Sequence, residues 1–138
     1  MYRLGTTSRK RLDTCCDTLQ AFVLSAIATS PIDFSVTAGY RCEEDQNAAC
    51  LAGYSKAKFG QSPHNFDPSV AVDLVPWVDG KLVWDDTSEH WDTLLEHLRI
   101  TASALFADGM INHNIENGYD RWGWDKPHHQ IRNWKDLT

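Results

Sequence analysis

The chain has 138 residues, of which 42% are hydrophobic, and this combination fits one globular domain and excludes a disordered chain. Its formal net charge of −6 argues against a protein that works on nucleic acid or on an anionic membrane surface. No apolar run is long enough for membrane insertion, and the basic N-terminal residues lack the apolar core of a secretory signal. We therefore expect synthesis in the cytoplasm and four reduced cysteines.

The first half of the chain carries two helix signals around one strand signal. Apolar residues recur every three to four positions and predict a first helix over residues 8–29. Alternating apolar residues predict a short strand over residues 33–40. A second helix is expected over residues 43–52, because its first turn is acidic and Gly53 follows its end.

The second half begins with a predicted hairpin over residues 70–84, whose Asp-Gly turn suits positive φ. The segments that follow are predicted as a helix (88–108), a strand (110–115), an irregular loop (116–127) and a final strand (128–134). Helices and strands without regular βαβ spacing indicate an α+β fold. We expect a small antiparallel sheet packed with two or three helices, in one compact domain over residues 1–138.

The segment "SPHNFDPSVAVDLVP" places Asp73 in a valine-rich strand and His64 before that strand. Because the Asp-Pro step between them favours a turn, His64 is expected on a loop and Asp73 on the strand. Asp73 shares its face with Ser69 and Ala71, small residues that leave space beside the carboxylate for a metal ion. Taken alone, the segment is explained more simply by a solvent-facing aspartate and a surface histidine.

A further polar cluster lies in "WDKPHHQIR", near the C-terminus. Pro127 disfavours helical geometry at the preceding residue, so a strand is expected to begin at His128. Strand alternation then places His128 on a polar face with Gln130 and turns His129 toward the packed side. Asp125 precedes His128 by three residues and can approach the same metal. Two histidines and one aspartate with an open fourth position are typical of catalytic zinc sites.

Three motifs, in one order along the chain, resemble those of zinc peptidases that cut the stem peptides of bacterial peptidoglycan. The segment around His64 and Asp73 is similar to the S-x-H…A-x-D signature, and "WDKPHHQ" is similar to the D-x-P-H motif of the phage branch. "VTAGYRCEEDQNAACLAGYSK" resembles a glycine-aromatic-arginine turn followed by a helix with a glutamine. The family includes D-alanyl-D-alanine carboxypeptidases and dipeptidases, and phage endolysins with L-alanyl-D-glutamate endopeptidase activity. The phage branch is the most similar.

The resemblance implies a role for each matched position. One catalytic zinc ion is expected in a cleft, and its ligands match His64, Asp73 and His128. The catalytic carboxylate of the family matches Asp125. The arginine that faces the scissile carbonyl matches Arg41. Two positions that line the substrate cleft match Ser62 and Gln46.

The chain departs from the family pattern in two places. His64 and Asp73 are nine positions apart, where the usual spacing is seven with a glycine between, and the extra residues fall around "DPS". His129 stands where the residue after the last ligand is usually apolar or aromatic. A change of ligand from His128 to His129 stays open, although strand alternation disfavours it.

The function implied by the resemblance is that of a zinc metallopeptidase, an endolysin acting on peptidoglycan stem peptides during host lysis. We expect a monomer without nucleic-acid partners or membrane insertion, held in the host cytoplasm until lysis carries it to the periplasm and cell wall. One alternative is a D-alanyl-D-alanine-type carboxypeptidase. Another is a non-catalytic domain that binds zinc or peptidoglycan, which would need neither Asp125 nor Arg41.

Other histidines and tryptophans have simpler expected roles. His90 and His97 lie seven residues apart on one predicted helix and are expected to face solvent. Trp122 and Trp124 either line a cleft or pack in the core, and packing is the commoner role of tryptophan.

Overall fold

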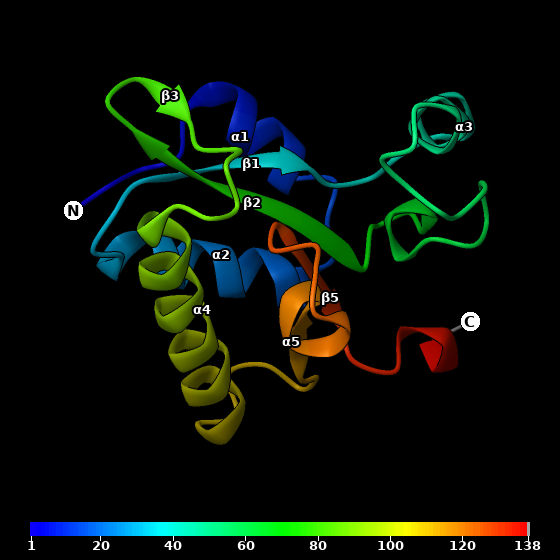
Figure 1. Cartoon of the computed structure of the whole chain (residues 1–138). Helices are drawn as coiled ribbons and strands as arrows, with labels where there is room; N and C mark the ends of the chain where they lie inside the picture. The colour runs from blue at the N-terminus through cyan, green and yellow to red at the C-terminus, as the bar shows by residue number, and fades with distance from the viewer. Residues whose placement is uncertain (138) are drawn as a thin grey trace.

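An antiparallel sheet of five strands forms the centre of the computed structural model, which describes residues 1–137 (Figure 1). The strands are β1 (Phe34–Ala38), β2 (Ala71–Val78), β3 (Lys81–Leu82), β4 (Ile115–Asn117) and β5 (His128–Ile131). Their order is β1-β2-β5-β4, and β3 pairs with β2 through the predicted hairpin. The α+β fold and the antiparallel sheet expected from the sequence are confirmed, whereas the described residues form five α-helices and not the expected two or three.

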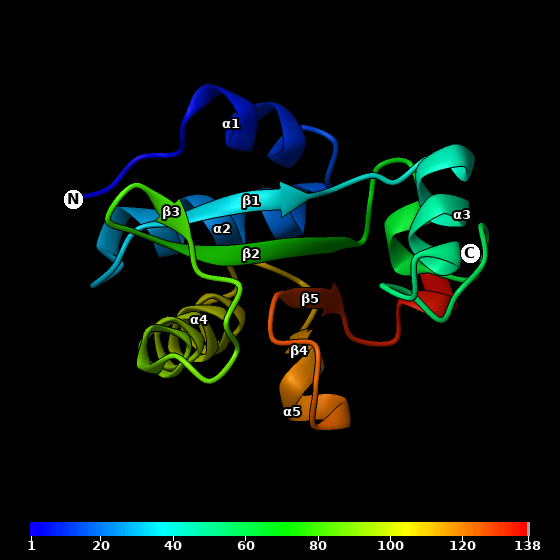
Figure 2. The ribbon, with the colours of Figure 1, turned by 45° about the horizontal axis from the view of Figure 1, so that its top comes forward.

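Helices lie on both sides of this sheet. They are α1 (Thr6–Leu12), α2 (Asp17–Thr29), α3 (Glu43–Leu51), α4 (Glu89–Ala107) and α5 (Gly118–Trp122), with short 3₁₀ helices at Pro63–Asn65 and Trp134–Leu137. Figure 2 shows α1 along β1, on the side away from β2. Within the described residues, none of the helices has the length and apolar character needed to cross a membrane.

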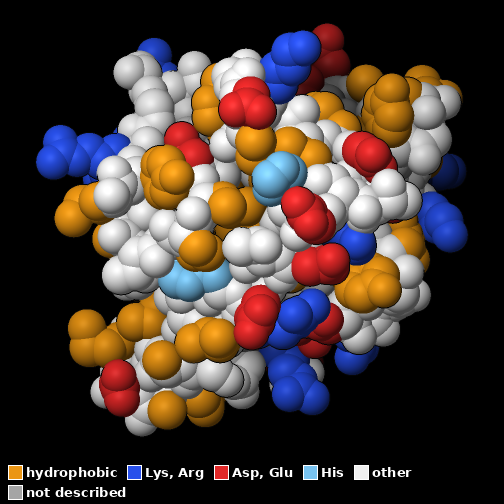
Figure 3. Space-filling view, turned by 60° about the vertical axis from the view of Figure 1, so that its left-hand side comes forward, with side chains coloured by type: hydrophobic (Ala, Val, Ile, Leu, Met, Phe, Trp, Pro, Cys, Tyr) orange, Lys and Arg blue, Asp and Glu red, His pale blue; other side chains and the backbone are white. Residues whose placement is uncertain are grey.

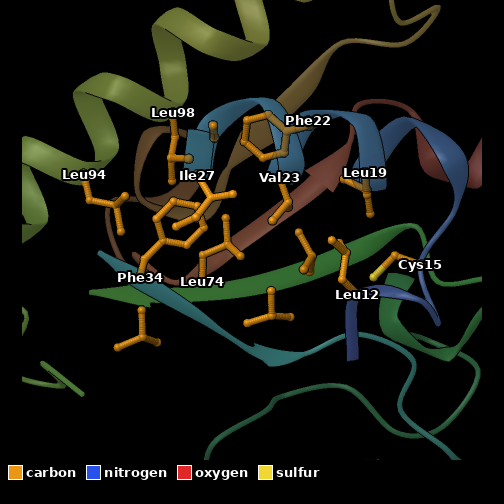
Figure 4. Close-up of a cluster of buried hydrophobic side chains, with 14 of the residues drawn as sticks. Leu12, Cys15, Leu19, Phe22, Val23, Ile27, Phe34, Leu74, Leu94 and Leu98 are labelled. Atoms are coloured by element: carbon orange, nitrogen blue, oxygen red, sulfur yellow. The ribbon is translucent and has the colours of Figure 1, made fainter. Parts of the chain in front are cut away.

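One cluster of apolar side chains fills the space between the sheet and helices α2 and α4 (Figure 4). The side chains that meet there include Leu19, Phe22, Val23, Ile27, Phe34, Leu74, Leu94 and Leu98. Burying a side chain of this kind stabilises the fold by roughly 1.5–3 kcal/mol. Val70, Val72 and Leu74 are all buried in this cluster, as the alternation in β2 predicts. The intervening Asp73 therefore points to the opposite face of the sheet.

The first predicted helix is divided into α1 and α2. The break lies at residues 13–16, where the Cys16 amide donates to the Ser69 carbonyl at 2.9 Å and the Ser69 amide donates to the Thr14 carbonyl at 2.9 Å. These bonds come from the segment that precedes β2, so they replace helical bonds with contacts that local periodicity does not reveal. In α1, the Ser8 hydroxyl and the Arg11 guanidinium bond the backbone of Val36 and cover the edge of β1.

The region predicted as a loop over residues 116–127 contains part of β4 and the helix α5. The Asn117 side-chain oxygen accepts hydrogen bonds from the amides of Tyr119 and Asp120 and caps α5 at its start. Gly123, at φ 81°, ends α5 in the left-handed conformation that glycine adopts without strain. The strand predicted over residues 110–115 is reduced to Ile115–Asn117, and the final strand stops at Ile131.

His97 does not face open solvent as the sequence indicated. Its Nε2 lies 2.9 Å from the carbonyl oxygen of Ala26, so the imidazole donates to the last turn of α2. This bond links α4 to α2 on the outer side of the core.

Candidate active site

The register between β2 and β5 brings the two predicted strand ligands together. Asp73 pairs directly with His128, and Val72 pairs with His129. Residues directly opposite one another in an antiparallel pair point to the same face of the sheet. Asp73 and His128 therefore share one face, whereas Val72 and His129 face the core, where the His129 ring lies 5.8 Å from the Phe22 ring.

His64 reaches the same point from the 3₁₀ helix that precedes β2. The Ser62 hydroxyl accepts a hydrogen bond from the His64 amide at 3.2 Å, and the Asn65 side-chain oxygen accepts from the Ser62 amide at 3.1 Å. These two bonds form a capping box that holds the short helix. The Asp67–Pro68 peptide that follows is cis, and the chain bends at residues 66–68 before β2 begins.

Three donor atoms converge beneath the surface. The His64 Nε2 atom lies 3.1 Å from Asp73 Oδ1 and 3.2 Å from His128 Nδ1, and His128 Nδ1 lies 3.4 Å from Asp73 Oδ1. Zinc bonds of about 2.0–2.1 Å at tetrahedral angles place neighbouring ligand atoms roughly 3.3 Å apart. The donor set and its spacing therefore fit a zinc ion. Within the described part of the chain, these residues are the one group found whose ligand atoms lie close enough to share a metal.

The outer nitrogens of both imidazoles are also bonded. His64 Nδ1 lies 2.8 Å from the Gly39 carbonyl, which only accepts, so Nδ1 carries the proton and Nε2 is free to bind a metal. His128 Nε2 lies 2.8 Å from the Gln130 oxygen, whose amide nitrogen donates to Glu116 at 2.8 Å. The sequence pattern did not predict these roles for Gln130 and Glu116. The signal for Gln130 was its place on the same strand face as His128.

His129 has both ring nitrogens bonded on the core side of the sheet. Its Nδ1 donates to the Pro127 carbonyl at 3.0 Å, and its Nε2 accepts from the Asn117 amide at 3.2 Å. Burial lowers the pKa of His129 to about 4, so this imidazole is neutral near pH 7. The structure thus brings His128, and not His129, to the cluster.

The ionisation of the cluster reflects its close spacing. Burial would raise the pKa of Asp73, but the charge of His64 and hydrogen bonds from both imidazoles hold that pKa well below its usual range. Burial would lower the pKa of His128, but its bond to Asp73 outweighs this effect and raises the pKa. In the absence of a metal, the cluster therefore retains a proton that a metal ion must displace.

Asp125 enters the site on a strained turn. Its φ of 63° lies in the left-handed region, and its carbonyl accepts from the His128 amide at 3.2 Å. A Cβ on Gly118 would lie 2.5 Å from the Asp125 carbonyl oxygen, so glycine is needed for this close approach. Burial, and then the charge of Asp73, raise the pKa of Asp125. A carboxyl with a raised pKa is suited to accept and return a proton.

Arg41 is held between the cluster and a buried amide. Its Nη2 lies 3.7 Å from Asp73 Oδ2, and its Nη1 donates to the Gln46 side-chain oxygen at 2.9 Å. Gln46 is fully buried, and its amide nitrogen donates to the Ser55 hydroxyl at 3.0 Å. Gln46 therefore lies behind Arg41 and does not line the cleft, which differs from its expected position.

A cavity of about 520 Å³ opens over the donor atoms. It is lined by the three donors and by Arg41, Ser62, Asp125, Trp122 and Trp124, among others. Trp122 and Trp124 are 46% and 47% exposed, so the expectation that they pack in the core is wrong. The Trp122 ring lies 5.6 Å from the His128 ring and forms one wall beside the cluster.

A family model described as phage L-alanyl-D-glutamate peptidase matches residues 1–126. The chain belongs to this family. The phage branch expected from the motifs is thereby confirmed. The matched region includes Asp125 and ends before His128, so the third donor atom is identified by the structure.

Two relatives illustrate the similarity. The L-alanyl-D-glutamate peptidase of Escherichia phage T5 is 29% identical over 90 residues, which span 65% of this chain and 65% of that protein. The L-Ala D-Glu endopeptidase ChiX of Serratia marcescens superposes with a TM-score of 0.75 at 23% identity. That match covers 98% of this chain and 93% of ChiX, and it shows that the two share a fold.

Proposed function

We propose that this chain is a zinc-dependent L-alanyl-D-glutamate endopeptidase that cleaves the stem peptides of bacterial peptidoglycan, with residues 1–138 as one catalytic domain. The observation that carries the proposal is the convergence of three ligand atoms within 3.1–3.4 Å, in a cavity that Asp125 and Arg41 also line. Membership of the phage family and the names of the two relatives support the choice of bond.

His64, Asp73 and His128 would hold the zinc ion and leave one side of it open to the cavity. A bound zinc ion supplies Lewis-acid polarisation of a carbonyl and lowers the pKa of water to about 7. The hydrogen bonds from the outer imidazole nitrogens to Gly39 and Gln130 keep both rings oriented for this task.

Asp125 acts as the general base and then as the general acid. Its carboxylate accepts a proton from the attacking water and returns it to the leaving amine, which its raised pKa favours. Arg41 provides a fixed positive charge for the carbonyl oxygen, which becomes negative during attack; one such donor contributes about 3 kcal/mol. A domain that only bound zinc or peptidoglycan would need neither group, so their presence in the cavity favours an enzyme.

The direct test uses zinc-loaded protein and defined muropeptides, with the products identified by mass. We expect cleavage between L-alanine and D-glutamate. Release of terminal D-alanine instead would identify the carboxypeptidase alternative, and intact muropeptides would contradict a peptidase function. Analytical ultracentrifugation of the same sample tests the expected monomer.

Zinc affinity is expected to fall with decreasing pH. The pKa of His128 is raised in the metal-free protein, so below that pKa zinc must displace a proton and its apparent affinity falls about tenfold per pH unit for each displaced proton. The measurement is the difference in Tm between zinc-loaded and chelator-treated protein from about pH 8 to about pH 5.5. Effects common to both forms, such as protonation of His129, cancel in this difference. A constant difference across this range would contradict the proposed ligand set.

The Gln46→Met variant is expected to lower kcat by roughly tenfold while zinc content stays unchanged. Methionine keeps the volume of the side chain but removes the oxygen that holds Arg41 and also accepts from Asn65. The half-buried donors of Arg41 and Asn65 then lose a partner, and so do the Ser55 hydroxyl and the Ala57 carbonyl, which costs about 1–3 kcal/mol of unfolding free energy. Steady-state kinetics, zinc stoichiometry and Tm are measured on one preparation. A parental kcat would show that Arg41 does not depend on Gln46.

We propose that the protein acts at host lysis, when peptidoglycan becomes accessible to enzymes made in the cytoplasm. The matching family is described as a phage peptidase, and the T5 relative is a phage protein, which supports this assignment.

A further inference from the structure

The cavity over the donor atoms gathers positive charge, although the chain as a whole is acidic. Four basic side chains line it, namely Arg41, Lys56, Arg121 and Lys135. Among the described residues, its acidic lining consists of Asp73 and Asp125. The whole chain has thirteen basic and nineteen acidic residues, and Figure 3 shows acidic and basic side chains interspersed over the face that it draws. This local excess of positive charge favours an anionic substrate group.

Lys56 differs from the other three cations in its contacts. Arg41 is bonded to Gln46 and close to Asp73, and Arg121 lies 3.8 Å from Glu116. Lys135 lies over the ring of Trp134 and makes a further interaction. Among the described residues, the exposed Lys56 ammonium lies over the ring of Trp124, 5.2 Å from the ring centroid. Lys56 is therefore the cation best able to bind a substrate carboxylate without breaking another ion pair.

The contact between Lys56 and Trp124 lies along the wall that leads to the donor atoms. Trp124 is 6.4 Å from Trp122, and Trp122 is 5.6 Å from His128, measured between ring centroids. An extended peptide advances about 3.3–3.6 Å per residue. A peptide that lies on this wall, with its scissile bond at the donor atoms, would therefore pass Lys56 within a few residues.

We propose that Lys56, held over the ring of Trp124, binds a free carboxylate of the stem peptide and thereby contributes to substrate selection. The inference rests on the proposed function. Glutamate has two carboxyl groups, and a peptide that continues through one of them leaves the other free. A second carboxylate lies at the C-terminus of the peptide. Both present the same chemistry to an ammonium group, and the substrates used in the test distinguish them.

The test compares three synthetic stem peptides: one with both carboxylates free, one with the free glutamyl carboxylate converted to a carboxamide, and one with the C-terminal carboxylate so converted. On the first peptide, Lys56→Met is expected to raise KM about five- to tenfold with little change in kcat, because the contact contributes equally to the ground state and the transition state. On the peptide that lacks the bound carboxylate, Lys56→Met and the parent should have equal KM values. Lys56→Arg should restore most of the affinity for the first peptide.

Lys58→Met is the matched control, because Lys58 is an exposed lysine of the same segment that does not line the cavity. Its KM values should equal those of the parent on all three peptides. An unchanged KM for Lys56→Met on the first peptide would overturn the proposal. So would an equal increase on all three peptides, because that pattern indicates a general disturbance of the cleft.

A binding measurement separates this inference from the proposed function. The affinities of the three peptides are measured by calorimetry in the Asp125→Ala background, with and without Lys56→Met. Absence of cleavage by the parent would reject the endopeptidase assignment. The carboxylate contact would still be visible in the Asp125→Ala protein that keeps Lys56, as a lower affinity for one of the two amidated peptides. Equal affinities for all three peptides would reject the contact itself.

Discussion

Asp125→Ala is expected to lower kcat by about 10²–10⁴-fold while leaving the zinc content unchanged. Asp125 accepts and returns the proton in the proposed mechanism, yet it is not one of the three residues whose atoms would bind zinc. The activity is measured on defined muropeptides, and zinc is quantified in the same preparation. Undiminished cleavage by the variant would contradict the assigned role of Asp125.

The backbone at Asp125 calls for a second variant. Its φ of 63° suits asparagine better than alanine, so Asp125→Asn preserves the turn while removing the basic carboxylate. We expect Asp125→Asn to be as inactive as Asp125→Ala and closer to the parent in Tm. Asp108→Ala, at an exposed aspartate just beyond α4, is the matched control and should keep parental activity.

The three proposed ligands should each be required for zinc. Replacement by alanine of any one of them is expected to weaken zinc binding more than about 100-fold, because the set is reduced to two ligands. The variants are His64→Ala, Asp73→Ala and His128→Ala. Zinc stoichiometry after dialysis, with circular dichroism to verify folding, is the measurement.

His129 provides the control for this series. His129→Ala should retain zinc, because its ring lies on the core side and both of its nitrogens bond there. Alanine also leaves a cavity that costs about 2–5 kcal/mol, so His129→Leu is a second variant that fills most of the space. Zinc lost on replacement of His129 but kept on replacement of His128 would move the ligand to the neighbouring residue.

Local structure followed from the sequence where one strand or turn decides it. The period of two in β2 correctly placed Val72 and Leu74 in the core, with Asp73 on the other face. The same rule correctly separated His128 from His129 in β5. These predictions hold because the alternation of side chains depends only on neighbouring residues within a strand.

Other elements depended on contacts between distant segments. The first helix is broken because Ser69 bonds the backbone of Thr14 and Cys16, more than fifty positions earlier in the chain. The helix α5 forms where a loop was expected; Asn117 caps its start, and the amide of the same side chain donates to the carbonyls of Lys126 and His128 beyond the helix. The bonds of Ser69 to Thr14 and Cys16 replace bonds within a helix, and such long-range bonds leave no local pattern in the sequence.

The sequence by itself determined which chemical groups are available for the site: two histidines, an aspartate, a second carboxylate and an arginine in a recognisable order. Only the tertiary structure decided how they meet. The register that pairs Asp73 with His128, the bond from His64 to Gly39 and the approach of Arg41 to Asp73 all join segments far apart in the chain. Register and loop packing are set by the free energy of the whole fold, whereas residue type and strand alternation are properties of a few neighbouring positions.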